Sequence, residues 1–148
     1  MADIILSIRK RWTLQILDGS KTLELRKRIP KPEKFKPGTD RIFLYETKAN
    51  KGAGAIVSVT DCPGTIKEKV DWLRNWYYGE MGDITDREYY GYFNRMDIAY
   101  GYKLANVFEF NTPIKITNPP QDYRFVSDYD PVCLLLPNNR HRIIKSKS

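Results

Sequence analysis

The segment from Thr22 to Arg28, which alternates apolar and polar residues, constrains this chain more than any other feature. On a β-strand, successive side chains point to opposite faces, so Leu23 and Leu25 can anchor one face in a core. The other face would carry a polar row that begins just after Lys21: Thr22, Glu24, Arg26 and Arg28. Burying such a row without partners is costly, so the row lies in solvent or lines a polar cleft, and we favour the cleft.

The positive charge of the chain is concentrated around this strand. The formal net charge is +7, and residues 1–51 hold thirteen Lys and Arg against six Asp and Glu. The remaining residues hold twelve of each kind, so the first third of the chain carries the whole excess. A basic face attracts polyanions by releasing their counterions. We therefore favour RNA or a nucleotide as the partner over a charged surface that only aids solubility.

Length and composition indicate an ordinary globular protein. With 148 residues, 41% apolar and 29% charged, the chain is most simply one domain, which we place at residues 1–139. The basic stretch 140–148 is expected to be a disordered tail. No apolar run approaches the roughly 20 residues that span a bilayer, and the start lacks a secretory signal pattern. We expect a cytoplasmic protein with no membrane partner. The sequence leaves the oligomeric state open and favours a monomer.

The cysteines and the histidine restrict the chemistry that the chain can perform. Cys62 and Cys133 stand alone, which favours two free thiols over a disulfide, and His141 is the only histidine. Zinc sites of the His/Cys kind and Ser–His or Cys–His pairs are thereby nearly excluded. We expect no metal and no cofactor, and acid–base chemistry would have to use Lys, Asp, Glu or Tyr.

Hydrophobic patterning predicts a mixed order of short strands and helices. The predicted strands are 4–8, 22–28, 42–47, 53–60, 98–110 with a bulge near Asn106, 112–116, and at most one more within 123–136. The predicted helices are 12–17, 65–78 and a short one opened by a capping box that starts at Thr85. This order indicates an α+β fold, a mixed β-barrel of about five to six short strands with two to three flanking helices.

Two groups of helical residues have both structural and functional interpretations. Trp72 and Trp76 form a stripe at the edge of the second predicted helix, where core or interdomain packing is favoured over stacking on bases. A weaker alternative is a protein-binding adaptor that uses the same two rings. Asp86 and Glu88 lie in the capping box, so helix capping is favoured over catalysis for both.

The motif Gly-x-Lys-x-x-Glu-x-Arg at residues 19–26, placed after a strand and a helix, resembles the signature of the ASCH domain, a branch of the PUA-like β-barrels. The similarity extends to the strands at 4–8, 44–47 and 53–59, to the aromatic helix and to the strand from 100 to 110. It covers about residues 4–117. The resemblance implies a PUA-like barrel and an RNA- or nucleotide-related role, with a cleft at the motif strand.

The resemblance also implies two kinds of hydrolase. One group of relatives removes the acetyl group from N4-acetylcytidine, and another has been assigned ribonuclease activity. The amidohydrolase group uses the motif lysine, a threonine three residues later and a carboxylate from a later helix. Lys21 matches the lysine, Glu24 stands at the threonine position, and Asp86 most nearly matches the carboxylate. Because Glu24 offers no neutral hydroxyl, the departure speaks against deacetylation.

These considerations predict one site and leave two function classes open. As a nucleic-acid-binding site it would comprise Lys21, Thr22, Glu24, Arg26, Arg28, Tyr45, Thr47, Lys48 and Lys51, with Tyr45 as the ring that stacks on a base. As a metal-independent ribonuclease or amidohydrolase it would use Lys21 and Glu24, with Asp86 as a weaker candidate. The structural alternative is an exposed lysine beside a surface ion pair of little consequence.

Overall fold

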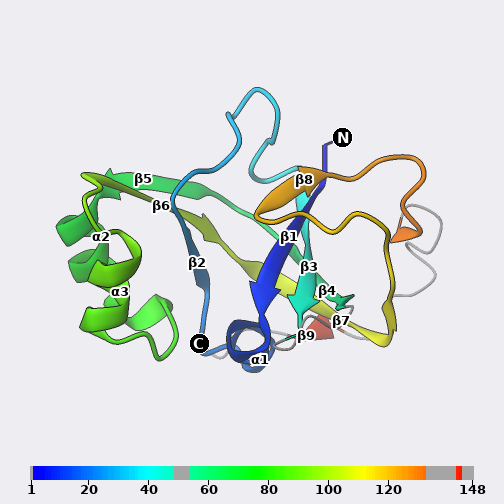
Figure 1. The fold of residues 1–148 in the computed structure, drawn as a ribbon, viewed down its shortest axis with the longest axis horizontal. Helices are drawn as coiled ribbons and strands as arrows, with labels where there is room; N and C mark the ends of the chain where they lie inside the picture. Colours follow the sequence, from blue (N-terminus) through cyan, green and yellow to red (C-terminus); the bar gives the residue numbers. More distant parts are fainter. Residues whose placement is uncertain (1, 49–53, 133–142, 145–148) are drawn as a thin grey trace.

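The structure, a computed structural model, describes residues 2–48, 54–132 and 143–144 (Figure 1). Within these residues the chain forms nine strands, three α-helices and one short 3-10 helix. In chain order they are β1 (Ile4–Arg9), α1 (Lys10–Asp18), β2 (Leu23–Arg26), β3 (Arg41–Thr47), β4 (Ala55–Asp61), β5 (Thr65–Lys69), α2 (Val70–Trp76), η1 (Tyr78–Glu80), α3 (Asp86–Tyr92), β6 (Ile98–Lys103), β7 (Ala105–Ile114), β8 (Tyr123–Phe125) and β9 (Ile143–Ile144).

The described strands form two sheets. The larger has the order β8-β1-β3-β4-β7-β9, and the smaller has the order β2-β6-β5. Strands β1 and β3 are parallel, and the other paired strands are antiparallel. The fold is therefore mixed α+β, as the sequence predicts. The two sheets are not closed into one barrel, so the barrel is not confirmed, and the strands outnumber the five to six that were expected.

The alternating motif strand folds as its pattern predicts. Leu23 and Leu25 are buried and pack with α2 and α3 in one apolar cluster. Glu24 and Arg26 point to the opposite face, and both are also buried. Figure 1 shows why both faces are covered: α2 and α3 lie on one side of β2, and α1, β1 and β3 lie on the other.

The chain crosses between the two sheets at the predicted bulge. Strand β6 belongs to the small sheet and β7 to the large one, with only Leu104 between them. Asn106 has a φ of 53°, and the register of β7 against β4 shifts between Val59 and Asp61. An asparagine tolerates this left-handed backbone conformation better than most residues. The bulge near Asn106 is thus confirmed.

The prediction of a helix over 65–78 is wrong in its first third. Residues Thr65–Lys69 form β5, which pairs with β6, and the helix α2 begins only at Val70. Partners for a strand come from elsewhere in the chain, so a short amphipathic segment at a sheet edge can be taken for the first turn of a helix. The capping box at the start of α3 is confirmed, with Thr85 and Glu88 bonded reciprocally.

Several expectations concern residues outside the described part of the chain. Cys133, His141, Lys51 and most of the basic tail lie there, whereas Ile143–Ile144 form β9 against β7. Cys62 is described and is a buried free thiol. Over the described residues, no helix combines the length and the apolarity that crossing a membrane requires.

Candidate functional site

Lys21, Glu24 and Arg26 form one buried ion network. Glu24 Oε1 lies 3.3 Å from Lys21 Nζ, and Glu24 Oε2 accepts hydrogen bonds from Arg26 Nε at 3.1 Å and Nη2 at 2.7 Å. The three residues are only 3%, 5% and 9% exposed, respectively. This is the polar row that the sequence predicts, and it is buried because its members are partners of one another.

The turn after α1 places Lys21 in this network. Gly19 ends α1 with a φ of 85°, a left-handed conformation that glycine adopts without strain. Its N–H donates a hydrogen bond to the carbonyl oxygen of Ile16. Lys21 Nζ then donates to the carbonyl oxygens of Leu23 at 2.8 Å and Met81 at 3.2 Å. Together with Glu24, these acceptors engage all three N–H bonds of the ammonium.

Burial and charge act in opposite directions on this network. Burial lowers the pKa of Lys21 from its ordinary value, and the neighbouring Glu24 opposes that shift. Burial alone would raise the pKa of Glu24, but the positive charges of Lys21 and Arg26 outweigh it and hold the pKa below the ordinary value. The carboxyl of Glu24 is therefore ionised at neutral pH, between two cations.

Arg26 extends the network to distant parts of the chain. Its Nη2 donates to the carbonyl oxygen of Ser7 on β1 at 2.7 Å, and its Nη1 donates to Asp122 at 2.8 Å. The guanidinium thus joins β2, β1 and the segment before β8. Such a planar fork has the geometry for several simultaneous hydrogen bonds, which a lysine lacks.

The network forms part of the wall of a pocket of about 310 Å³ between β1, α1, β2 and α3. The lining residues are Ser7, Ile8, Arg9, Arg11, Trp12, Lys21, Glu24, Leu25, Arg26, Ile84, Glu88 and Tyr92. This volume is at the lower end of the range for small-molecule sites. The pocket combines four cationic side chains and two carboxylates with two aromatic rings. Trp12 lies beneath two of the cations, with Arg11 Cζ 4.1 Å and Lys21 Nζ 4.7 Å from its ring centroid.

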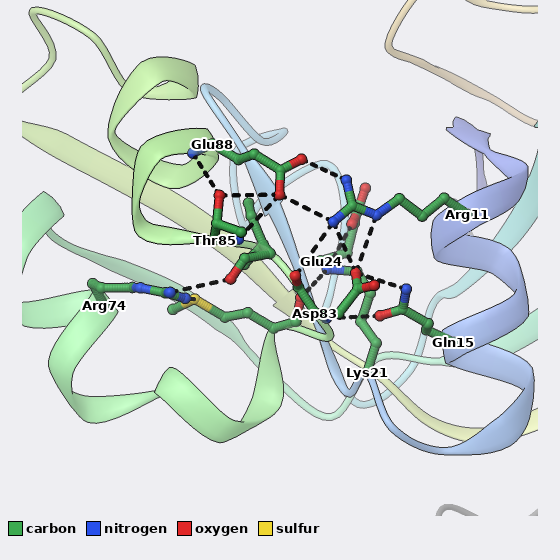
Figure 2. A network of polar contacts seen from close by, with 10 residues as sticks. Arg11, Gln15, Lys21, Glu24, Arg74, Asp83, Thr85 and Glu88 are labelled. Atoms are coloured by element: carbon green, nitrogen blue, oxygen red, sulfur yellow. Dashed lines mark hydrogen bonds and ion pairs between the residues drawn. The ribbon is translucent and has the colours of Figure 1, made fainter.

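Arg11 connects two walls of this pocket, as Figure 2 shows. From α1 it forms ion pairs with Asp83 and with Glu88 on α3, and Gln15 on the next turn of α1 also binds Asp83. Glu88 receives the hydrogen bonds of Arg11 as well as those of the helix cap at Thr85, and they lower its pKa to about 2. The Arg11 side chain remains 40% exposed and so is accessible to a ligand.

The structure brings together only part of the predicted site. Lys21, Glu24 and Arg26 line the pocket, whereas Thr22 is not among the lining residues and its hydroxyl lies 3.5 Å from Glu80 Oε1. Arg28 is well exposed and reaches Asp122 at 3.5 Å, outside the residues that line the pocket.

The predicted residues on β3 and beyond lie elsewhere. Tyr45 is 5% exposed in the core of the large sheet, and its hydroxyl oxygen accepts the N–H of Gly54, so the expected stacking of its ring on a base does not fit its position. Thr47 donates to the carbonyl oxygen of Ile8, and Lys48 is exposed. Asp86 lies outside the pocket and is bound to Arg74.

Sequence reasoning missed several residues of the pocket. Arg9, Arg11 and Trp12 form a basic–aromatic run at the junction of a strand and a helix, a signal that could have been used. Tyr92 carries no comparable signal, and neither does Asp122, which does not line the pocket but pairs with Arg26. Only the tertiary structure brings these two residues near the motif strand. Among the described residues there is no cluster of three or more His, Cys, Asp or Glu side chains that could hold a metal ion.

The fold and the pocket together define a small mixed α+β domain with a cationic and aromatic site beside β2, the edge strand of the smaller sheet. The family model of the ASCH domain matches residues 6–119. The chain therefore belongs to the ASCH domain family, as the motif predicted.

Solved structures agree with this assignment at the level of the fold. The crystal structure of ASCH from Zymomonas mobilis is 22% identical, with a TM-score of 0.75 over 90% of this chain and 93% of that one. A serine-to-alanine mutant of the same protein gives 22% identity and a TM-score of 0.75, and covers 90% of this chain and 94% of that one. A tyrosine-to-phenylalanine mutant of that protein is 21% identical, with a TM-score of 0.75 over 90% of this chain and 96% of that one. No match to a curated protein was found.

Proposed function

We propose that this protein binds RNA or a nucleotide, with one nucleotide unit in the pocket between α1, β2 and α3. The observation that carries the proposal is the composition of that pocket, which is lined by Arg9 and Arg11 together with the rings of Trp12 and Tyr92. Cations attract phosphate, and aromatic rings stack on bases. The two kinds of group within one small cavity fit a nucleotide better than either a purely apolar or a purely anionic ligand.

The buried network has a supporting part in this proposal. Lys21 has its three N–H bonds engaged, and Arg26 is bonded to Glu24, Asp122 and Ser7, so neither is a freely available phosphate ligand. We assign Lys21 and Arg26 the role of a fixed polar surface at the wall of the pocket, against which the edge of a base is oriented. Contact with phosphate falls to Arg9 and Arg11, and to a basic rim that includes Arg28 and Lys48.

RNA binding is expected to weaken markedly with salt. About six phosphate contacts on a single strand would give a slope of log K against log salt of roughly −4. Fluorescence anisotropy of a labelled single-stranded RNA at several salt concentrations measures the slope. A flat salt response, or no binding at low salt, would remove the nucleic-acid proposal.

A second candidate is a hydrolase that acts on RNA or on a modified nucleoside. The observation in its favour is that an ammonium and a carboxylate, Lys21 and Glu24, lie 3.3 Å apart within the pocket wall. An amine must lose a proton before it acts as a base or nucleophile, and burial lowers the pKa of Lys21 in that direction. The three acceptors around Nζ, however, stabilise the charged form, which favours binding over catalysis.

N4-acetylcytidine is expected to be hydrolysed slowly or not at all, because Glu24 stands where the amidohydrolase relatives have threonine. Incubation with N4-acetylcytidine, and separately with mixed RNA, followed by chromatography, measures both activities of the second candidate. Rapid release of acetate or cleavage of RNA, lost in Lys21→Ala while the variant remains folded, would make the enzyme the better proposal.

A further inference from the structure

The helix α2 presents two tryptophans to solvent that the pocket does not explain. Trp72 is 48% exposed and Trp76 is 63% exposed, one turn apart on the outer face of α2. Their ring centroids are 5.6 Å apart with an interplanar angle of 36°. The inner face of the same helix is occupied by Val70 and Leu73, which are buried. The two tryptophans therefore do not pack in the core of the described residues, which was one of the two structural roles that the sequence favoured.

Exposed tryptophans at this spacing form a continuous aromatic surface, which we call the tryptophan platform (Trp72 and Trp76). Large apolar side chains gathered on a surface are typical of binding sites rather than of solvated faces. The platform is separate from the pocket: Figure 1 shows α2 at the outer edge of the molecule, with β2 between it and α1. Neither tryptophan lines the pocket.

The charges beside the platform indicate the occupant. Lys69 Nζ lies 4.9 Å from the centroid of the Trp72 ring. Lys67, two residues earlier on β5, is exposed and points to the same side of the strand. A third lysine, Lys103, has its Nζ 5.9 Å from the ring centroid of Tyr77, which directly follows α2. Aromatic rings with ammonium groups beside them match the alternating bases and phosphates of a single strand.

We propose that the tryptophan platform is a second contact for single-stranded RNA, on which a base stacks on Trp76 while Lys69 holds a neighbouring phosphate. Trp76 is the better stacking surface, because it is the more exposed ring and no cation among the described residues lies over it. The inference rests on the proposed function: the pocket binds one nucleotide, and the platform binds the strand where it continues past β2.

Binding of adenosine 5′-monophosphate and of oligoadenylates of increasing length separates the two contacts. Trp76→Ala is expected to leave the dissociation constant of the mononucleotide unchanged and to raise that of the long oligomers about tenfold, as loss of one stacked base does. Trp76→Phe should restore most of the affinity, since a ring remains. Lys69→Gln should lower the slope of log K against log salt by about one for long oligomers alone.

The matched control is Tyr129→Ala, which removes a ring that is 96% exposed in the segment after β8. Tyr129→Ala should leave the dissociation constants of both the mononucleotide and the long oligomers unchanged. Thermal unfolding should show that every variant is folded. If Trp76→Ala binds the long oligomers as the wild type does, the platform is not an RNA contact. If Trp76→Ala instead abolishes self-association of the protein, the platform is likewise not an RNA contact. If the wild type binds no RNA of any length, the proposed function itself fails.

Discussion

Glu24→Gln is expected to destabilise the protein by about 3–5 kcal/mol, the usual cost of removing one partner from a buried ion network. The substitution preserves size and hydrogen-bonding capacity but leaves the charges of Lys21 and Arg26 without their shared counterion. Both are buried, so water cannot replace the carboxylate. Denaturant unfolding followed by circular dichroism at neutral pH measures the loss. A change below about 1 kcal/mol would mean that the network behaves as a surface ion pair.

The pH dependence of stability gives a second readout of the same group. The pKa of Glu24 is lower in the folded state than its ordinary value of 4.5. The contribution of its ionised carboxylate to the free energy of unfolding is therefore fully present above pH 4.5. The contribution is lost as the pH falls through the lower folded pKa. Glu88 also has a lowered pKa, so the wild type and Glu24→Gln are compared over the same acidic range. The difference between them should shrink as the pH falls, and a constant difference would contradict the assignment.

Two further variants separate charge from packing in this network. Lys21→Met in the Glu24→Gln background removes one of the unpaired cations, so it should recover part of the lost stability. Arg28→Gln is the matched surface control, because the Arg28 side chain is 77% exposed and lies 3.5 Å from Asp122. It should change stability by less than about 1 kcal/mol. Lys21→Met is also measured alone. If the stability loss of the double variant, relative to the wild type, equals the sum of the losses of the two single variants, the two residues do not interact.

Arg11→Ala is expected to raise the dissociation constant of adenosine 5′-monophosphate about tenfold to a hundredfold. The estimate is the loss of one charge-assisted hydrogen bond to phosphate, about 1.5–3 kcal/mol. Arg11 is the group chosen because it lines the pocket and remains 40% exposed. Isothermal titration calorimetry at low salt measures the change, with thermal unfolding to show that the variant is folded.

The matched variant is Glu88→Gln, which should lower the dissociation constant. Glu88 and Asp83 hold the guanidinium of Arg11, so they compete with a ligand phosphate for it. Glutamine keeps the acceptor that the N–H of Thr85 needs, because the capping box accepts Glu or Gln. Opposite effects of the two variants identify Arg11 as a ligand contact. Equal weakening by both would mean that the ion pair only holds α1 against α3.

Local patterns of the sequence predicted the elements whose geometry depends on neighbours in the chain. The alternation from Leu23 to Arg26, the capping box at Thr85 and the bulge near Asn106 were all predicted and are confirmed. Each follows from a short period or from spacing within a few residues, which the backbone imposes without tertiary help. The motif also predicted that the chain belongs to the ASCH domain family, which the family model confirms.

Contacts between distant segments decided which edge segment is a strand and which aromatic side chains are buried. The sequence leaves open whether 65–69 is a strand, because β6 supplies its pairing partners from 29 to 37 residues away. It also does not determine burial: Tyr45, which was expected to face the cleft, is in the core, and Trp72 and Trp76 are exposed to solvent. An aromatic side chain fits either environment, and only the shape of the surrounding elements selects one.

The candidate site shows the same division. Lys21, Glu24 and Arg26 were found from the sequence because they lie within six residues of one another on one strand and its approach. Their partner Asp122 is 96 residues from Arg26, and Glu88 is 77 residues from Arg11. The sequence by itself determined which polar groups share the motif strand. The tertiary structure alone decided that they are buried, because only folding covers both faces of the strand and brings Asp122 within hydrogen-bonding distance of Arg26.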